Sequence, residues 1–200
     1  MKTWNKYSRG ETTMIIAGID YSMTSPSICV YASKKSESFS FNKCKLYFLT
    51  DTKKYSGTFK NVVGKNFNEW NEDTERFKSI SDWAIDVLNY VEQVGLEGYS
   101  YNSTGKVFHI AENTGILKYK LYNDGTPYEV YSPSAIKKFA TGKGNADKEL
   151  MYNSFVDETK VDLMELLDCK QTKIGNPVSD IVDSYYVCKK LHSEYRSKSS

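Results

Sequence analysis

The sequence predicts one mixed α/β domain whose five-stranded sheet carries helices on both faces. Three short apolar segments, 14–20, 27–32 and 40–49, follow one another closely, as the strands of an antiparallel meander do. Two later apolar segments, 106–112 and 128–131, alternate with helix-like stretches, a pattern typical of parallel crossover connections. The expected order is therefore three antiparallel strands followed by two parallel strands.

The first of these strands ends abruptly on a carboxylate. Residues 14–19 are apolar and rich in β-branched side chains, which is typical of a strand buried on both faces, and Asp20 follows directly. A carboxylate in this position either caps the next turn or stands at the sheet edge, where it can help to hold a cation. For Asp20 taken alone, both interpretations are open.

The helices are predicted from the spacing of apolar residues. The longest covers 72–94, where apolar side chains recur every three or four positions and Gly95 and Gly98 provide a stop. Residues 51–68 carry turn-forming residues and are expected to be an exposed loop. Further helices are predicted over 116–122, 135–140, 146–156, 161–167 and 177–191.

Length and composition limit the kind of protein. Two hundred residues suit a single domain, with 1–13 and 193–200 as loose tails. No apolar run approaches the roughly 20 residues of a membrane span, and the N-terminal residues lack the apolar core of a signal peptide. The four cysteines are scattered, without a Cys-x-x-Cys pair, which argues against a zinc site and for reduced thiols. We therefore expect a cytoplasmic protein with no membrane contact.

The charge balance does not by itself identify a partner. The net charge is +2, and only three of the 27 basic residues are arginines. Lysines act as point charges on phosphates, so this composition suits contact with a nucleic-acid backbone better than base reading. Most of the 16 tyrosines are expected to be half-buried, although some could stack on exposed bases.

Three further acidic residues lie at the ends of predicted elements. Glu112 ends the predicted fourth strand, and Asp180 and Asp183 lie three residues apart on one face of the last helix. The first strand is expected to be central with the fourth parallel beside it, so Asp20 and Glu112 leave the sheet at the same edge. Taken singly, the helix aspartates are more typical of residues that stabilise the helix dipole, and Glu112 of a surface residue.

The convergence of all four carboxylates favours a metal site. Left alone, they would repel one another and raise their own pKa values, and a divalent cation removes that repulsion. Hard oxygen ligands suit Mg²⁺ or Mn²⁺, and two such ions about 4 Å apart are the usual apparatus of phosphodiester hydrolysis. The interpretation requires the last helix to cross the same sheet edge.

Four segments, 18–20, 110–112, 134–148 and 179–183, also carry a family pattern in order along the chain. The most specific is the third, in which Lys137, Gly142, Gly144 and Lys148 keep an order of lysine, Gly-x-Gly and Ala-acid-Lys. Together these segments resemble the RuvC family of Holliday-junction resolvases, within the ribonuclease H superfold. The divergence is similar to that of viral members, which would place the protein in a host cytoplasm.

The resemblance implies roles for individual residues. The expected metal-binding and catalytic acids are Asp20, Glu112, Asp180 and Asp183. Lysines that contact the scissile region of the DNA are expected at Lys137 and Lys148, with Lys148 also acting in catalysis. Independently of the family, the turn 142–145 feeds a helix start whose backbone N–H groups can meet a phosphate. The remaining DNA-binding candidates are Lys138, Lys143, Gly144, Asn145 and Tyr119.

One family feature is missing at its expected place. An aromatic wedge three residues after the strand-end Glu would fall on Gly115. Ile116, Tyr119 or Tyr122 could take its place, and the aromatic helix 116–122 is also a candidate for part of a subunit interface.

The function that follows is a metal-dependent crossover junction endodeoxyribonuclease. It would resolve four-way DNA junctions as a homodimer, by paired symmetric nicks. A broader nuclease for forks and flaps remains open on the same fold, as does a non-catalytic junction-binding protein, although a pure binder gains nothing from clustered carboxylates. A sugar-kinase or actin-like ATPase would require a duplicated domain, and the sequence contains no internal repeat.

Overall fold

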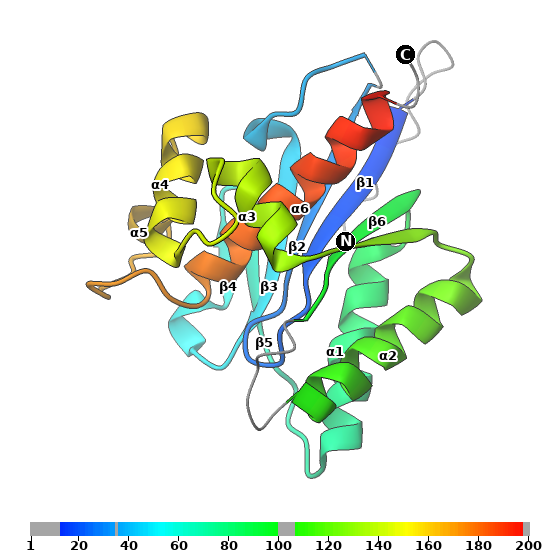
Figure 1. The fold of residues 1–200 in the computed structure, drawn as a ribbon. Coiled ribbons are helices and arrows are strands. Elements are labelled where there is room, and N and C mark those ends of the chain that lie inside the picture. The colour runs from blue at the N-terminus through cyan, green and yellow to red at the C-terminus, as the bar shows by residue number, and fades with distance from the viewer. Residues whose placement is uncertain (1–12, 35, 100–106, 198–200) are drawn as a thin grey trace.

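The computed structural model describes residues 13–34, 36–99 and 107–197. Within them a seven-stranded mixed sheet in the order β4-β5-β3-β2-β1-β6-β7 lies between two helical layers (Figure 1). The strands are β1 (Thr13–Asp20), β2 (Ser27–Lys34), β3 (Cys44–Thr50), β4 (Gly57–Phe59), β5 (Val62–Asn66), β6 (Gln93–Glu97) and β7 (Tyr128–Tyr131). The helices are α1 (Asp73–Leu88), α2 (Val107–Asp124), α3 (Pro133–Thr141), α4 (Lys148–Thr159), α5 (Leu163–Leu166) and α6 (Val178–Ser197). The predicted α/β class is confirmed.

Strand directions bring several strand ends to one edge. β1, β2 and β3 form the predicted antiparallel meander, while β6 pairs with β1 and β7 with β6 in parallel. Since two antiparallel steps restore the direction, β3 runs the same way as β1. The carboxyl ends of β1, β3, β6 and β7 therefore meet at the same edge, where ligands of open α/β sheets usually bind.

The predicted loop over 51–68 is wrong in part. It contains β4 and β5, which form a hairpin that adds β5 in parallel to β3 at the margin of the sheet. This raises the strand number in the described residues from the five predicted to seven. The glycines that suggested a loop lie inside the hairpin strands, where Gly64 meets Tyr55 and Phe48 so closely that a Cβ would not fit.

The predicted strand over 106–112 is also wrong. Residues from Val107 onward form α2, which includes the helix predicted over 116–122, and Lys106 lies outside the described residues. The fourth strand of the core is β6 instead, in a stretch predicted as the end of the helix over 72–94. That helix, α1, already ends at Leu88.

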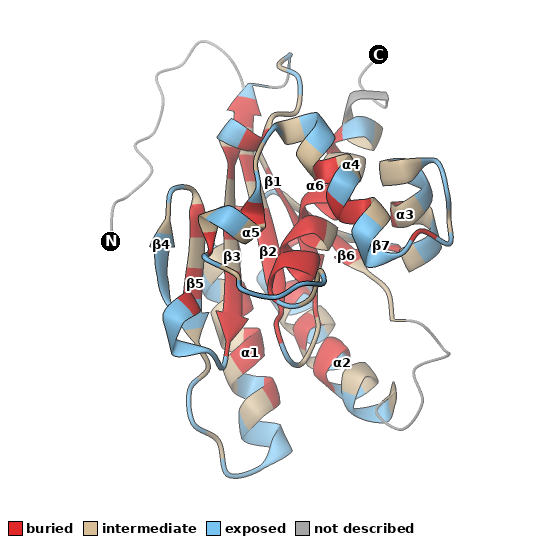
Figure 2. Cartoon of the chain, turned by 90° about the vertical axis from the view of Figure 1, so that its left-hand side faces the viewer, coloured by how far each residue is buried: buried red, intermediate tan, exposed pale blue. Residues whose placement is uncertain are grey.

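Two apolar cores lie on the two faces of the sheet, and Figure 2 shows the buried residues along α6 and the central strands. Alternate residues of β1 serve different cores, as the period of a strand requires. Met14 and Ile16 pack in the core that contains α6, whereas Ala17 and Ile19 pack in the core that contains α1 and α2. No helix in the described ranges combines the length and apolar character needed to cross a bilayer.

Helix α6 lies directly against the backbone of β1. A Cβ at Gly18 would lie 2.1 Å from the backbone nitrogen of Cys188, so only glycine allows this approach. Gly95, the partner of Gly18 in the β1–β6 register, is next to Val187 of the same helix. α6 extends to Ser197, beyond the predicted end at residue 191.

We predict that Gly18→Ala lowers the free energy of unfolding by at least about 2 kcal/mol, because backbone atoms of α6 must move to admit the methyl group. Urea denaturation measures the difference. Gly115→Ala is the control, since apart from its chain neighbours and the nearby backbone of α2 no atom lies within 4 Å of its Cβ position. That substitution should stabilise the helix by about 0.5–1 kcal/mol. Equal stability of the Gly18→Ala variant and wild type would contradict the packing described.

Candidate metal centre

Asp20 is the last residue of β1 and belongs to the face that α6 covers. Its side chain follows those of Met14 and Ile16 in the alternation along the strand, with Gly18 between. In the register with β2 it stands opposite Ser27, whose hydroxyl is hydrogen bonded to that of Ser184 on α6 at 3.0 Å. The sequence-predicted position of Asp20 at the end of a central strand is confirmed.

Glu97 takes the position that the sequence suggested for Glu112. It is the last residue of β6, two residues beyond Gly95, so it shares the sheet face and the sheet edge of Asp20. Its charge raises the pKa of Asp20, which places the two carboxylates in one electrostatic environment. Glu112 lies exposed on α2 and is absent from this group.

The first turns of α6 bring Asp180 and Asp183 to the same edge. Three carboxylates, those of Asp20, Asp180 and Asp183, each offer an oxygen within 4.8 Å of the others. The spacing of three residues on a helix gives the two aspartates a shared face, as the sequence predicted. The close approach of α6 at Gly18 then places that face over the end of β1.

Burial raises the pKa of all four carboxyl groups. The pKa of Asp20 lies well above its usual range, first because of burial and then because Asp180, Glu97 and Asp183 repel its charge. Burial and the charge of Asp183 raise the pKa of Glu97 to about 8. Burial also raises the pKa of Asp183 to about 7, with a further contribution from Asp180. For Asp180 burial raises the pKa to about 6. The cluster is therefore hard to ionise fully without a compensating cation.

The donor atoms fit a hard divalent cation. Asp180 Oδ1 accepts a hydrogen bond from Ser179, whereas its other oxygen, Oδ2, is buried and makes no well-aligned hydrogen bond among the described residues, although the nearby Ser25 hydroxyl lowers the pKa of Asp180. A buried carboxylate oxygen in that state is costly unless it is coordinated. Carboxylate oxygens are the ligands that Mg²⁺ and Mn²⁺ prefer, so the residues present suit such an ion.

Two lysines border the carboxylates. Lys148 is the first residue of α4, and its Nζ donates a hydrogen bond to Ser179 Oγ at 3.1 Å. Its charge lowers the pKa values of the three aspartates against the effect of burial. Lys137 on α3 does the same for Glu97 and Asp183. A cation at a helix N-terminus is unfavourable for the helix dipole, so the position of Lys148 requires another reason.

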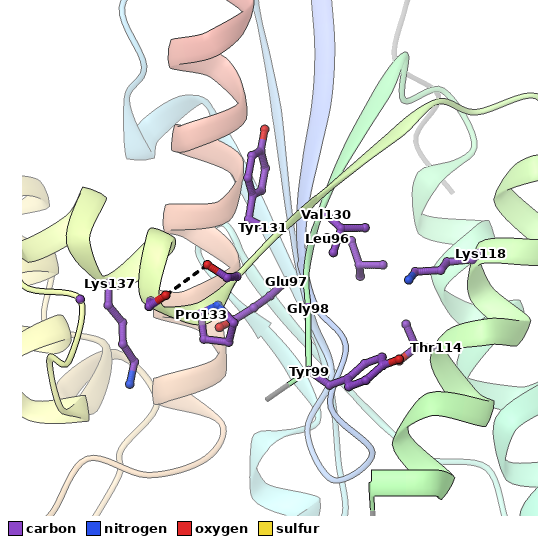
Figure 3. Close-up of a pocket in the computed structure, with 13 residues that line it drawn as sticks. Leu96, Glu97, Gly98, Tyr99, Thr114, Lys118, Val130, Tyr131, Pro133 and Lys137 are labelled. Carbon is purple, nitrogen blue, oxygen red and sulfur yellow. Dashed lines mark hydrogen bonds between the residues drawn. The ribbon is translucent and has the colours of Figure 1, made fainter. Parts of the chain in front are cut away.

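A cavity of about 650 Å³ opens beside Glu97, between α2 and α3 (Figure 3). Lys118 of α2 and Lys137 of α3 lie on opposite sides of it, and Gly144 lines it from the turn after α3. The predicted turn over 142–145 is confirmed, with Gly142 in the left-handed conformation at the end of α3. Lys138 on α3 and Lys143 and Asn145 in this turn are exposed, as are Ser134 and Phe139 of α3.

Two other sequence predictions, the role of Tyr119 and the position of the aromatic wedge, concern residues outside the carboxylate cluster. Tyr119 is 65% exposed on α2, together with Phe108 and Tyr122. Because Glu97 ends the strand, the position three residues after the strand-end acid is Ser100 rather than Gly115, and Ser100 lies outside the described residues.

Glu97 has a sequence signal that could have identified it. The segment Val94-Gly95-Leu96-Glu97 is a short apolar run that ends on a carboxylate, as Ile19-Asp20 does. Val91 and Val94, however, continue the helical spacing of α1, and Gly95 and Gly98 are typical of a helix stop. A strand of five residues is too short to outweigh that periodicity.

The fold matches solved structures, although no family model and no curated protein matches the sequence. The structure of Thermus thermophilus RuvC covers 93% of this chain and 96% of its own, with a TM-score of 0.57 at 17% identity. The same protein in complex with a Holliday junction substrate matches over 91% of this chain and 97% of its own, with a TM-score of 0.57 at 18% identity. The yeast mitochondrial Holliday junction resolvase Ydc2 matches over 92% of this chain and 82% of its own, with a TM-score of 0.50 at 16% identity. The chain therefore has the RuvC-like, ribonuclease H-type fold that its sequence resembles.

The raised carboxyl pKa values predict how stability depends on pH without metal. Between about pH 4, where these groups ionise in an unfolded chain, and about pH 8, the pKa of Glu97, the folded protein binds more protons than the unfolded one. The free energy of unfolding should therefore fall as the pH rises through this range. In EDTA at pH 8, Asp20→Asn should raise the melting temperature by a few degrees.

The same variant should lose most of the stabilisation that Mg²⁺ or Mn²⁺ adds to the wild-type protein, because it removes a charged ligand. Differential scanning fluorimetry with a metal titration measures both effects. Glu112→Gln serves as the control and should respond to metal as wild type does. Equal metal stabilisation of the wild type and Asp20→Asn would exclude Asp20 as a ligand.

Proposed function

We propose that this protein is a metal-dependent, structure-selective endonuclease that resolves four-way DNA junctions. The observation that carries the proposal is the convergence of Asp20, Asp180 and Asp183 within 4.8 Å, with Glu97 beside them, at the carboxyl edge of a RuvC-like sheet. The Thermus protein of the same fold is known in complex with a Holliday junction, and the yeast protein of this fold is a Holliday junction resolvase.

In this proposal Asp20, Glu97, Asp180 and Asp183 hold two Mg²⁺ ions, for which Mn²⁺ can substitute. Ions held there would supply an activated water and would neutralise charge on the departing oxygen of the phosphodiester. The chain itself contributes four buried carboxyl groups held at one sheet edge. Burial that raises carboxyl pKa values in the free protein strengthens the attraction of the same groups for a cation.

The basic margin of the site suits the DNA backbone. We assign Lys137 and Lys148 to the phosphates nearest the cut, since their charges already act on the carboxylates. Lys148 would stabilise charge that develops on the scissile phosphate. The exposed residues Lys138, Lys143 and Asn145, with backbone N–H groups near Gly144, would position the strand at the end of α3.

A homodimer is the second part of the proposal. One chain carries one set of carboxylates, whereas resolution of a nearly two-fold symmetric junction requires two nicks, so two identical sites in an isologous dimer match the substrate. The outer face of α2 is a suitable interface, because Phe108, Tyr119 and Tyr122 are 78%, 65% and 78% exposed. With Gly115 they are spaced by seven, four and three residues, which places them on one side of the helix. Tyr119 is thereby assigned to the interface rather than to DNA.

We expect the protein to act in the cytoplasm. Cys29, Cys44 and Cys188 are free and buried in the same core, which suits a reducing compartment.

Cleavage assays on labelled DNA test the assignment of the carboxylates. Asp20→Asn and Glu97→Gln should each lower the single-turnover rate on a four-way junction by at least about 100-fold, because each removes a metal ligand rather than an outer partner of one. Binding to the junction in Ca²⁺ should persist.

Asp86→Asn, at an exposed acid on α1, is the matched control for this test and should cut within about twofold of the wild-type rate. The wild-type protein should prefer the four-way junction over forks, flaps and plain duplex. Equal cutting of forks and flaps would favour the broader branched-DNA nuclease, and binding without any cutting would favour a junction-binding protein.

The interface is tested by placing a charge on the outer face of α2. Tyr122→Glu should convert a dimer into monomers in light scattering, because it puts a carboxylate where two apolar faces meet. On a supercoiled cruciform plasmid the variant should accumulate singly nicked circles, while the wild type gives linear product. Asn153→Glu adds the same charge on the exposed surface of α4 and should leave the dimer intact. A wild-type protein that remains monomeric, free and on junction DNA, would contradict the dimer.

A further inference from the structure

Asn176 connects Lys148 to two other segments of the candidate site. Its Oδ1 accepts a hydrogen bond from Lys148 Nζ at 3.4 Å, and its Nδ2 donates to Thr24 Oγ1 at 3.3 Å, on the loop that follows β1. The Lys148 ammonium also donates to Ser179 Oγ at 3.1 Å, and Ser179 Oγ lies 3.1 Å from Asn176 Oδ1. One amide side chain thus joins the start of α4, the loop after β1 and the start of α6.

The chemistry of an amide suits the task of holding a lysine without neutralising it. A lysine side chain has a flexible stem and adopts many rotamers on a surface, so a fixed ammonium needs fixed acceptors. The amide oxygen of Asn176 and the hydroxyl of Ser179 accept from Lys148 but carry no charge. The ammonium therefore keeps its full charge for an anion, which a carboxylate partner would cancel.

The contacts of Asn176 do not serve the end of a helix. Among the described contacts its side chain meets side chains only: it bonds to Lys148 and Thr24, and it shares the one hydroxyl proton of Ser179 with Asp180 Oδ1. The backbone N–H of Ser179 instead bonds to the carbonyl of Gly175. The side chain is thus directed at Lys148, whose charge acts on Asp20 and on the two helix aspartates.

We infer that Asn176 is a positioning residue for Lys148, and that it holds the ammonium at the margin of the carboxylate cluster, where a scissile phosphate would lie. The consequence for catalysis depends on the proposed nuclease function, whereas the orientation of Lys148 does not. Since a small displacement of a catalytic group is costly, Asn176→Ala should lower the single-turnover cleavage rate by about 10-fold while the affinity for junction DNA stays within about twofold.

A double-mutant cycle separates positioning from a general structural role. The wild type, Asn176→Ala, Lys148→Ala and the double variant are compared on the same junction. If Asn176 acts through Lys148, Asn176→Ala should lower the rate by less than about twofold in the Lys148→Ala background. A full 10-fold loss in both backgrounds would overturn the inference. Asn153→Ala, an exposed asparagine on α4, is the control and should cut as wild type does.

The isosteric change Asn176→Asp separates the effect of the shape of this side chain from the effect of its charge. It keeps the shape of the side chain but adds a charge that pairs with Lys148, so the cleavage rate should fall although the melting temperature is maintained. Cutting at the wild-type rate by this variant would show that only shape matters and would overturn the inference.

An observation independent of cleavage tests the orientation directly. Nitrogen-15 NMR at low temperature detects lysine ammonium groups whose protons exchange slowly, and the Lys148 signal is assigned by its loss in Lys148→Ala. Asn176→Ala should accelerate its exchange, whereas the Lys120 ammonium, paired with Asp82, should not change. Unchanged exchange at Lys148 would overturn the inference even in an active enzyme. If no protein in the series cuts any DNA, the nuclease function fails, and the NMR result still decides the role of Asn176.

Discussion

Helix α6 can lie on the backbone of β1 only because Gly18 leaves room for the backbone of Cys188. This approach determines where the first turns of the helix stand relative to the end of the strand. It brings Asp180 and Asp183 to Asp20, and the parallel register with Gly95 adds Glu97 on the same face. The carboxylate cluster is therefore a consequence of sheet and helix packing, with no loop needed to assemble it.

The same packing gathers four carboxyl groups whose ionised forms repel one another. Burial and mutual repulsion disfavour the ionised forms of the carboxylates, which are the forms that a metal site would need, and the pKa of Glu97 reaches about 8 for that reason. Lys137 and Lys148 relieve part of the repulsion from the margin, without forming an ion pair with any of the four acids in the described residues. Neutral acceptors around Lys148 leave its charge available. The site thus has excess negative charge at its centre, which suits a bound cation. In the described part of the chain, Lys137 and Lys148 at its margin are not in ion pairs, which suits contact with a phosphate.

Sequence patterns predicted most of this arrangement, and the errors have physical causes. Asp20 and the two α6 aspartates are predictable because a long apolar run defines where β1 ends and a long helical periodicity defines where α6 begins. Glu97 was missed because the apolar residues of β6 continue the helical spacing of α1 across the turn at residues 89–92. Glu112 was chosen because Val107-Phe108-His109-Ile110 has the β-branched and aromatic composition of a strand, although packing against α1 makes it a helix. Propensity over four residues is weak, and tertiary contacts decide such segments.

The correction at Glu97 also changes what α2 does. Since the strand end supplies the carboxylate, no residue of α2 is needed in the acidic cluster, and three successive residues show how the helix is used instead. Leu117 is fully buried against the sheet, Lys118 lines the cavity beside Glu97, and Tyr119 is 65% exposed on the outer face. Each residue turns the helix by about 100°, so these three directions are set by the backbone itself. The buried face holds α2 as a rigid element. A partner bound on its outer face would therefore also fix the position of Lys118 beside the cavity. Assembly and DNA positioning would then be coupled through one element, over the width of a single helix.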